Sequence, residues 1–240
     1  MTPAAGGRTR EKICLLYTGG TIGMVRAKRG ELRPPERPED FLKLAPELKD
    51  VVDFDFEPVM NKDSTNVNHR DWEVVARKIH ELMHSNRGYT GYVVAHGTDT
   101  MHFTASAVSF ALGNKLPAPI VFTGAQTIPE VHHGDARVNL MRAFEVAVHD
   151  IGEVVISFGD YVFRGNRAQK KDEARFDAFE SPALFPLAHI TEKILIHSLM
   201  APRIPGAAVP LQADFADGVL QISLIPGLTA SLVTPAIENP

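Results

Sequence analysis

The sequence has little of the chemistry that would place a protein outside the cytoplasm or across a membrane. Its one cysteine, Cys14, has no partner for an internal disulfide, and we expect it to fill the core as a small hydrophobe. No run of 18 apolar residues exists, which excludes a membrane-spanning helix. The first residues, MTPAAGGRTREK, lack the apolar segment of a secretory signal, and we expect residues 1–12 to form a disordered tail. These absences predict a cytoplasmic protein with no membrane partner.

A strong charge of either sign is also lacking. The chain has 25 Lys and Arg residues against 29 Asp and Glu residues, which leaves a net charge of −4. Nucleic-acid-binding domains usually carry a basic stripe, so we expect no nucleic-acid partner. The histidines lack the paired spacing of metal ligands, so we expect no metal, and we expect His132 and His133 to be solvated in a loop.

What the sequence does contain is an alternation of buried strands and amphipathic helices. Apolar, β-branched runs predict strands over residues 13–17, 92–95, 120–122 and 154–158. Helical patterns lie between them over residues 69–86, 99–114 and 135–150. The predicted apolar faces consist of Trp72, Val75, Ile79, Leu82 and Met83, then Phe103, Val108, Phe110 and Leu112, then Val138, Met141, Phe144 and Val148. This order predicts an α/β fold with an open, mostly parallel sheet and helices on both faces.

The composition changes after about residue 186. We expect a main domain over residues 13–186 and a linker over residues 187–217, which includes the Pro- and Gly-rich MAPRIPGAAVP. Residues 218–240 predict one strand, a turn and the start of a helix, too little for a stable domain by itself. We interpret this segment as the start of a truncated second domain.

Each predicted strand runs into a loop that carries glycine and polar groups. The loops read TGGTIG, HGTDTM, TGAQTIP and FGDYVFRGNRAQKKD in chain order. Ligands of open α/β sheets bind beyond the carboxyl ends of the strands, so we expect these loops to converge on one site. TGGTIG lacks the spacing of dinucleotide and P-loop motifs, so we expect no nucleotide cofactor.

Acyl transfer accounts for these loops better than phosphate binding. Gly19 and Gly20 allow the backbone to approach a small substrate and expose N–H groups that could hold an oxyanion. Thr21 follows them with a hydroxyl, which is a poor nucleophile until a base activates it. The second loop adds Thr98 beside Asp99, and a lysine from a later loop could move protons with this pair.

The motifs YTGGTIGM and HGTDTM together resemble the bacterial-type L-asparaginases, and RGNR is similar to their cytoplasmic type I branch. The resemblance runs from about residue 13 to residue 233 and implies a flavodoxin-like catalytic domain. It implies that Thr21 is the nucleophile and that Thr98, Asp99 and Lys170 are catalytic, with Lys171 a lesser candidate. It implies substrate binding by Ser64, Thr65, Asp99 and the carbonyl of Ala125.

The activity implied by the resemblance is hydrolysis of the side-chain amide of L-asparagine. Attack by Thr21 would release ammonia and leave an acyl-enzyme, which water would convert to aspartate. Asp99 would pair with the α-ammonium of the substrate and Ser64 with its α-carboxylate. The resemblance further implies no cofactor and a homo-oligomer, either a dimer or a tetramer.

The sequence departs from the family in two places, and these keep alternatives open. The loop MVRAKRGELRPPE has no tyrosine where many relatives have one, and Glu31 or Leu32 stands at that position. Relatives also have a longer C-terminal domain that completes the site. The alternatives are a catalytically impaired protein that binds an amino acid, or a glutaminase or amidotransferase-type amidase. We expect His96 to be structural. Asp135 and Asn139, in GDARVN, resemble a family motif too, but we expect them to be capping and loop-packing residues.

Overall fold

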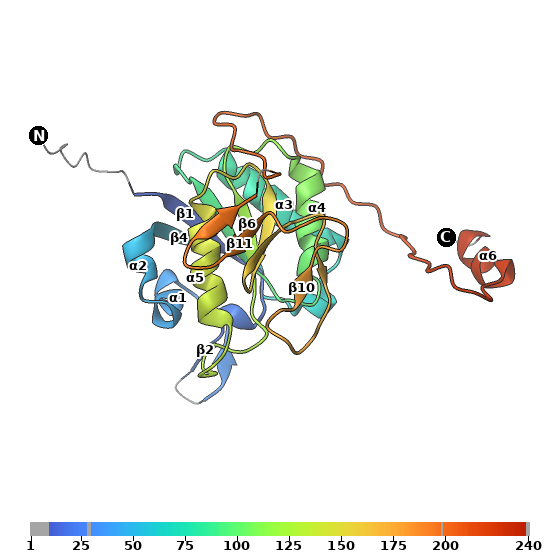
Figure 1. The fold of residues 1–240 in the computed structure, drawn as a ribbon, viewed down its shortest axis with the longest axis horizontal. Helices are drawn as coiled ribbons and strands as arrows, with labels where there is room; N and C mark the ends of the chain where they lie inside the picture. The colour runs from blue at the N-terminus through green and yellow to red at the C-terminus, as the bar shows by residue number, and fades with distance from the viewer. Residues whose placement is uncertain (1–9, 28–29, 198, 239–240) are drawn as a thin grey trace, which may run out of the picture.

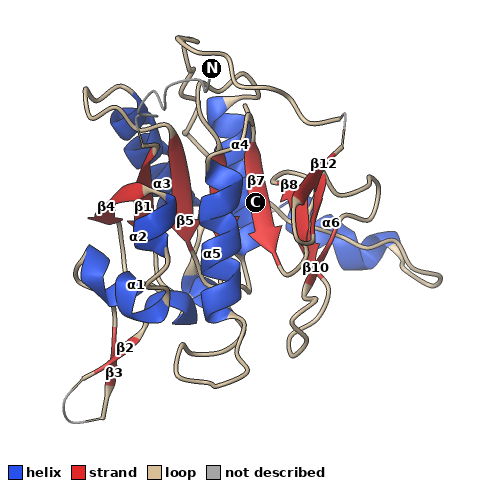
Figure 2. Ribbon diagram, turned by 60° about the vertical axis from the view of Figure 1, so that its left-hand side comes forward, coloured by secondary structure: helices blue, strands red, loops and turns tan. Residues whose placement is uncertain are grey.

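A central sheet of eight strands organises the molecule. The computed structural model describes residues 10–27, 30–197 and 199–238. The strand order is β12-β11-β8-β7-β6-β5-β1-β4 (Figures 1 and 2). The strands are β1 (Lys12–Tyr17), β4 (Asp53–Pro58), β5 (Gly91–Ala95), β6 (Ile120–Thr123), β7 (Val154–Phe158), β8 (Tyr161–Arg164), β11 (Ala188–Ile190) and β12 (Ile194–Ile196). Two small hairpins lie outside this sheet, β2 (Val25–Arg26) with β3 (Leu32–Arg33) and β9 (Gln169–Lys170) with β10 (Phe179–Glu180).

The five strands β7-β6-β5-β1-β4 are parallel, and β8, β11 and β12 extend the sheet in antiparallel fashion. Numbered along the chain, the parallel strands have the order 2-1-3-4-5, which is the flavodoxin-like order. The predicted fold class is therefore confirmed. The strand that the pattern missed in this core is β4, whose sequence DFDFEP alternates acidic and aromatic residues because it lies at the edge of the sheet.

Helices cover both faces of the sheet. On one face lie α3 (His69–Met83) and α4 (Met101–Leu112), and on the other α1 (Pro38–Leu44), α2 (Leu48–Val51) and α5 (Ala136–Ala147) (Figure 2). Successive side chains of β1 serve the two cores in turn, since Cys14 packs against the first set of helices and Ile13 against the second. Cys14 is fully buried, as expected, and burial raises the pKa of its thiol to about 12.

Three predicted core residues on the helices are instead exposed. Phe103 and Phe110 of α4 are 49% and 68% exposed, and Val138 of α5 is 42% exposed. At about 100° per residue, Val108 lies roughly 140° around the helix from Phe103, so the two cannot share one face. The buried stripe of α4 passes through Val108 and Leu112 together with small residues, which a count of large apolar side chains overlooks.

The segment expected to be a linker contributes to the main body. The strands β11 and β12 lie within residues 187–217 and pair with the sheet. Farther along, the backbone N–H of Gln212 donates to the carbonyl of Ala111 at 2.9 Å, and the ring of Phe215 packs edge-on against Trp72. This part of the chain therefore lies across α3 and α4 instead of spanning free space.

Beyond Phe215 the chain leaves the body, and the last described element is α6 (Ala230–Glu238), which has no buried residue (Figure 1). The strand expected within residues 218–240 is not formed, because residues 218–229 contain a turn and no strand. At the other end, residues 1–9 of the expected tail lie outside the described residues, and Lys12 already belongs to β1. In the described part of the chain, no helix has the length and apolar character needed to cross a membrane.

Candidate active site

The polar loops meet at the carboxyl edge of the sheet around a cavity of about 410 Å³. Thr21 begins the 3-10 helix η1 (Thr21–Gly23) after β1, and Ser64 begins η2 (Ser64–Asn66) after β4. The lining residues are Gly20, Thr21, Met24, Asn61, Lys62, Asp63, Ser64, Gly97, Thr98, Asp99, Ala125, Gln126, Lys170 and Glu173. The expected convergence of the loops is therefore present in the fold.

Two glycines bring the loop before Thr21 against its neighbours. Gly19 and Gly20 have φ values of 128° and 84°, a region that favours glycine. A Cβ atom on Gly20 would lie 2.6 Å from the Cα of Gly97, and one on Gly19 would lie 2.0 Å from the carbonyl oxygen of Lys62. The two glycines are thus required both by conformation and by close approach of three loops.

Thr21 lines the cavity, and its hydroxyl bonds to the third loop. Its Oγ1 donates a hydrogen bond to the carbonyl oxygen of Ala125 at 2.7 Å. The cavity is also lined by Ala125 itself. The structure therefore joins the two residues that come from the first and third loops, 104 positions apart.

Lys170 connects the fourth loop to the second. Its side chain is 4% exposed, and Nζ donates to Oδ1 of Asp99 at 2.6 Å and to Oγ1 of Thr98 at 3.1 Å. The hydrogen bond from Lys170 holds the pKa of Asp99 below its usual range. Burial favours the neutral amine of Lys170, but hydrogen bonds to Asp99 and Glu173 outweigh burial and raise its pKa. Lys170 is therefore an ammonium near neutral pH in this arrangement.

The two substrate-binding candidates of the β4 exit have different environments. Ser64 is buried, donates to Oδ2 of Asp99 at 3.3 Å and accepts the Asp99 backbone N–H at 3.2 Å. Thr65 is exposed, bonds to Asp63 at 2.9 Å and does not line the cavity. Lys171 likewise points elsewhere, since its Nζ pairs with Asp177 at 2.9 Å. The structure brings Ser64 and Lys170 to the cavity but not Thr65 or Lys171.

Among the lining residues that sequence reasoning missed, Gln126 and Glu173 contact the predicted catalytic set. Oε1 of Gln126 accepts the hydroxyl of Thr98 at 2.9 Å, and its Nε2 donates to the carbonyls of Asp172 and Arg175. Glu173 accepts a hydrogen bond from Lys170. The available signal for Gln126 was its place directly after Ala125 in TGAQ, whereas nothing local distinguishes Glu173 from a surface acid.

Residues interpreted as structural do support the loops. His96 is buried, its ring nitrogens lie 2.7 Å from the carbonyl oxygen of Gly97 and 2.9 Å from Oγ1 of Thr104, and burial lowers its pKa to about 4. Asp135 accepts the backbone N–H of Gln126 at 2.9 Å, and Asn139 donates to the carbonyl of Gly124 at 3.0 Å. These bonds hold the loop that presents the Ala125 carbonyl to Thr21.

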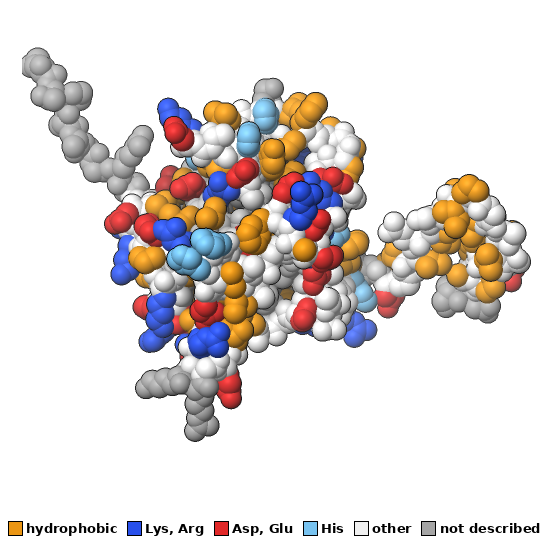
Figure 3. Space-filling view, turned by 60° about the horizontal axis from the view of Figure 1, so that its bottom comes forward, with side chains coloured by type: hydrophobic (Ala, Val, Ile, Leu, Met, Phe, Trp, Pro, Cys, Tyr) orange, Lys and Arg blue, Asp and Glu red, His pale blue; other side chains and the backbone are white. Residues whose placement is uncertain are grey.

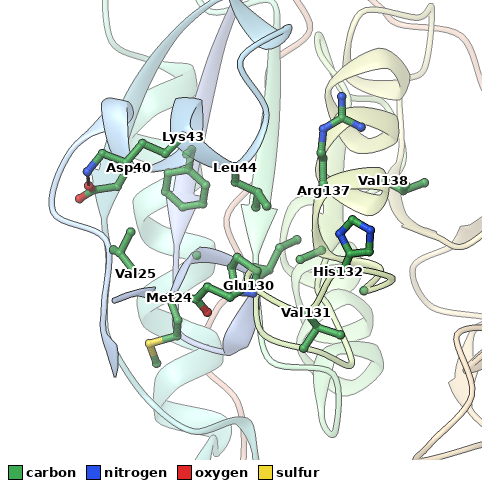
Figure 4. A pocket seen from close by; sticks show the side chains of 16 residues that line it. Met24, Val25, Asp40, Lys43, Leu44, Glu130, Val131, His132, Arg137 and Val138 are labelled. Atoms are coloured by element: carbon green, nitrogen blue, oxygen red, sulfur yellow. Dashed lines mark hydrogen bonds and ion pairs between the residues drawn. The ribbon is translucent and has the colours of Figure 1, made fainter. Parts of the chain in front are cut away.

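A second cavity, of about 500 Å³, lies beside the Thr21 loop (Figure 4). Side chains after Thr21 and from α1 form one side, and those of the 129–134 loop and α5 form the other. Its charged residues are engaged, since Asp40 pairs with Lys43 at 3.1 Å and Arg137 pairs with Glu47. This cavity holds no set of groups comparable to Thr21, Asp99 and Lys170.

The loop position that lacks a tyrosine belongs to a projecting hairpin. Leu32 lies in β3 and is 42% exposed, and the hairpin of β2 and β3 extends away from the body (Figure 2). Neither Glu31 nor Leu32 lines the cavity that contains Thr21. The tyrosine nearest to that loop in the sequence, Tyr17, is buried, and its hydroxyl donates to the carbonyl of Gly20 at 3.1 Å.

Charged residues of both signs line the cavity, with Lys62 and Lys170 beside Asp63, Asp99 and Glu173. Figure 3 shows acidic and basic side chains interspersed over the face that it presents. Within the described residues, no three His, Cys, Asp or Glu side chains are grouped so that they could hold a metal ion. The cavity offers hydroxyls, side-chain amides, carboxylates and the buried ammonium of Lys170.

Comparison with known proteins gives a consistent picture. Residues 12–201 match the family model described as asparaginase, N-terminal. The chain is 34% identical over 239 residues to L-asparaginase 1 of Escherichia coli, which covers 96% of this chain and 68% of that protein. It is also 34% identical over 242 residues to a glutamyl-tRNA(Gln) amidotransferase subunit of Methanosphaera stadtmanae, covering 96% of this chain and 54% of that protein.

The solved structures agree with the sequence relatives. The crystal structure of L-asparaginase I from Vibrio cholerae superposes with a TM-score of 0.83 at 29% identity, covering 97% of this chain and 70% of that one. The chain thus spans about half the length of the amidotransferase subunit and about two thirds of the bacterial asparaginases. Because the family model covers most of its length, this chain belongs to the asparaginase family.

Proposed function

We propose that this chain hydrolyses the side-chain amide of L-asparagine to L-aspartate and ammonia, with Thr21 as the nucleophile. The observation that carries the proposal is one cavity lined by the Thr21 hydroxyl and by the hydrogen-bonded set of Thr98, Asp99 and Lys170. A nucleophile, a proton-carrying group and a carboxylate at one site are what acyl transfer requires.

In the first half of the reaction, Oγ1 of Thr21 attacks the amide carbon, and its proton passes to the departing nitrogen, which leaves as ammonia. The bond from Thr21 to the Ala125 carbonyl is given up at this step, because that oxygen cannot act as a base. Backbone N–H groups of the Thr21 and Thr98 loops would hold the oxyanion. In the second half, water adds to the acyl-enzyme and releases aspartate and the Thr21 hydroxyl.

Proton movement would be the task of Thr98, Asp99 and Lys170. Lys170 donates to both other members in the free protein, so it has to lose a proton before it can accept one. Asp99 would also pair with the α-ammonium of the substrate, and Ser64 would face the α-carboxylate, with Thr65 contributing only if its loop moves. Hydrogen bonds of catalytic groups often tighten only in the complex with substrate.

The relatives also support a second candidate function, that of an amidase acting on glutamine or on a glutamine-like group. Both an L-asparaginase and an amidotransferase subunit are 34% identical to this chain. A protein that binds an amino acid without turnover is the third reading. We further propose a cytoplasmic homo-oligomer of type I, either a dimer or a tetramer, whose catalytic domain includes residues 13–186.

The deciding experiment measures ammonia release from L-asparagine and from L-glutamine by the purified chain, with Thr21→Ala as control. Release from L-asparagine that disappears in Thr21→Ala supports the proposal. Faster release from L-glutamine supports the second candidate. Binding of L-asparagine in a calorimeter without any release supports the third reading and contradicts the proposed activity.

A further inference from the structure

Glu173 brings a second carboxylate to the amine of Lys170. Nζ of Lys170 donates to Glu173, to Oδ1 of Asp99 at 2.6 Å and to Oγ1 of Thr98 at 3.1 Å. An ammonium carries three hydrogens, so these three acceptors account for all of them. A neutral amine has two hydrogens and would leave one acceptor without a donor. The arrangement around Lys170 therefore fits the charged form and opposes loss of its proton.

The turn that carries Glu173 is held in place on two sides. Within the turn, Oδ1 of Asp172 accepts the backbone N–H groups of Ala174 and Arg175 at 2.8 and 2.9 Å. From outside, Nε2 of Gln126 donates to the carbonyls of Asp172 and Arg175 at 3.3 and 3.2 Å. Because Gln126 also accepts the Thr98 hydroxyl, the turn with Glu173 is tied to the residue that Lys170 contacts. The ion pair is thus part of the site and not an incidental surface contact.

We propose that Glu173 is a positioning residue, which holds Lys170 as an ammonium directed at Thr98 and so sets the pH above which Lys170 can accept a proton. The kinetic consequence rests on the proposed function, but the effect on the Lys170 amine does not. Glu173 is suited to this role because its side chain is 78% exposed at the rim, whereas Lys170 is 4% exposed. Because Glu173 lies at the rim, its carboxylate can be replaced by an amide without disturbing the core.

The other titratable groups that face Lys170 do not replace Glu173. Asp99 is bonded to Ser64 as well as to Lys170, so we expect it to stay in place when Glu173 is changed. His102, on α4, is half-buried, and burial together with the charge of Lys170 lowers its pKa, so it is neutral at pH 7. Its buried Nδ1 has no hydrogen-bond partner in the described structure. Removal of Glu173 therefore removes one of the two negative charges that contact this ammonium.

The test follows the Lys170 amine directly in the full chain. Lysine labelled with ¹³C at Cε is titrated by NMR, and the Lys170 resonance is assigned by its loss in Lys170→Arg. In Glu173→Gln the titration midpoint of that resonance should fall by roughly 0.5 to 1 pH unit. This is the low end of the shift caused by a nearby opposite charge, because Glu173 is exposed. Glu180→Gln is the matched control, since Glu180 lies on the same hairpin and pairs with Gln169 at 2.9 Å. It should leave the Lys170 midpoint where it is.

The kinetic readout is separate. If the chain hydrolyses L-asparagine, the rise of kcat/KM with pH should move to lower pH in Glu173→Gln by the same amount and stay unchanged in Glu180→Gln. A Lys170 midpoint that is equal in the wild-type chain and Glu173→Gln overturns the inference, whatever the activity. A lowered midpoint in a chain without hydrolysis upholds the inference and refutes the proposed function.

Discussion

The ammonium nitrogen of Lys170 lies 2.6 Å from Oδ1 of Asp99, although the two residues are 71 positions apart in the sequence. One belongs to the loop after β5 and the other to the β9 strand of a small hairpin. This ion pair links the second and fourth loops at the carboxyl edge of the sheet. Its disruption should therefore affect both chemistry and the pH dependence of stability, and these effects can be measured separately.

Replacement of the nucleophile should abolish turnover and leave the fold. Thr21→Ala removes one hydrogen bond, to the Ala125 carbonyl, so unfolding free energy should fall by about 1 kcal/mol. The rate of ammonia release should fall by at least about 10³-fold, because no hydroxyl is left to attack. Thr21→Ser, which keeps the hydroxyl, should retain part of the activity. Equal rates for the wild-type chain and Thr21→Ala would show that Thr21 is not the nucleophile.

The two adjacent lysines should differ sharply. Lys170→Met should lower kcat by about 10² to 10⁴-fold, the range for loss of a positioned proton-transfer group. Lys171→Met should stay near the wild-type rate, because Lys171 pairs with Asp177 at the surface. Ammonia release by the two variants at pH 7 and 9 checks this. A larger loss in Lys171→Met would mean that Lys171, and not Lys170, has the catalytic role.

The pKa of Asp99 predicts how acid affects stability. Lys170 lowers the pKa of Asp99 in the folded chain. The stability that ionised Asp99 contributes is therefore fully present above the unfolded pKa of 3.8 and is lost as pH falls through the lower folded pKa. In Lys170→Met the folded and unfolded values should approach each other. Urea denaturation between pH 5 and about pH 2 should then show a shallower acid loss in the variant. Equal slopes for both chains would contradict the linkage between Lys170 and Asp99.

A methyl group on Gly20 should be far more damaging than one on an exposed glycine of similar conformation. Gly20 and Gly88 both have positive φ, at 84° and 71°, but the space around Gly88 is open. Gly88→Ala should cost about 1 kcal/mol from backbone strain, and Gly20→Ala should cost more and reduce ammonia release, because Thr21 is displaced. Thermal unfolding with parallel assays separates the two. Similar losses in both variants would mean that close approach to Gly97 adds nothing.

The corrected helix faces can be tested with two phenylalanines. Phe144 of α5 is fully buried and Phe110 of α4 is 68% exposed. Phe144→Ala should lower unfolding free energy by about 3 to 5 kcal/mol, whereas Phe110→Ala should change it by less than about 0.5 kcal/mol. Chemical denaturation of both variants decides between these faces. A large loss in Phe110→Ala would restore the face expected from the apolar pattern.

Local pattern was sufficient for much of the fold and part of the site. The strands β1, β5, β6 and β7 begin or end within a residue or two of their predicted positions, because fully buried parallel strands are continuous apolar runs. Edge elements were harder to predict, since β4 alternates acidic and aromatic residues and β11 and β12 are three residues each. Phe103 and Phe110 misled the reading of α4, because apolar content does not state which side of a helix faces the sheet.

What the sequence by itself determined is the set of strand-exit loops and their chemistry. Gly19, Gly20 and Thr21 are adjacent, and so are Thr98 and Asp99, so short-range spacing carries their meaning. What only the tertiary structure decided is which distant groups complete them. Gln126 contacts both Thr98 and the 172–175 turn, Glu173 contacts Lys170, and Thr65 does not line the cavity. These relations depend on how separate loops pack at the sheet edge, and no local pattern encodes a distance between loops.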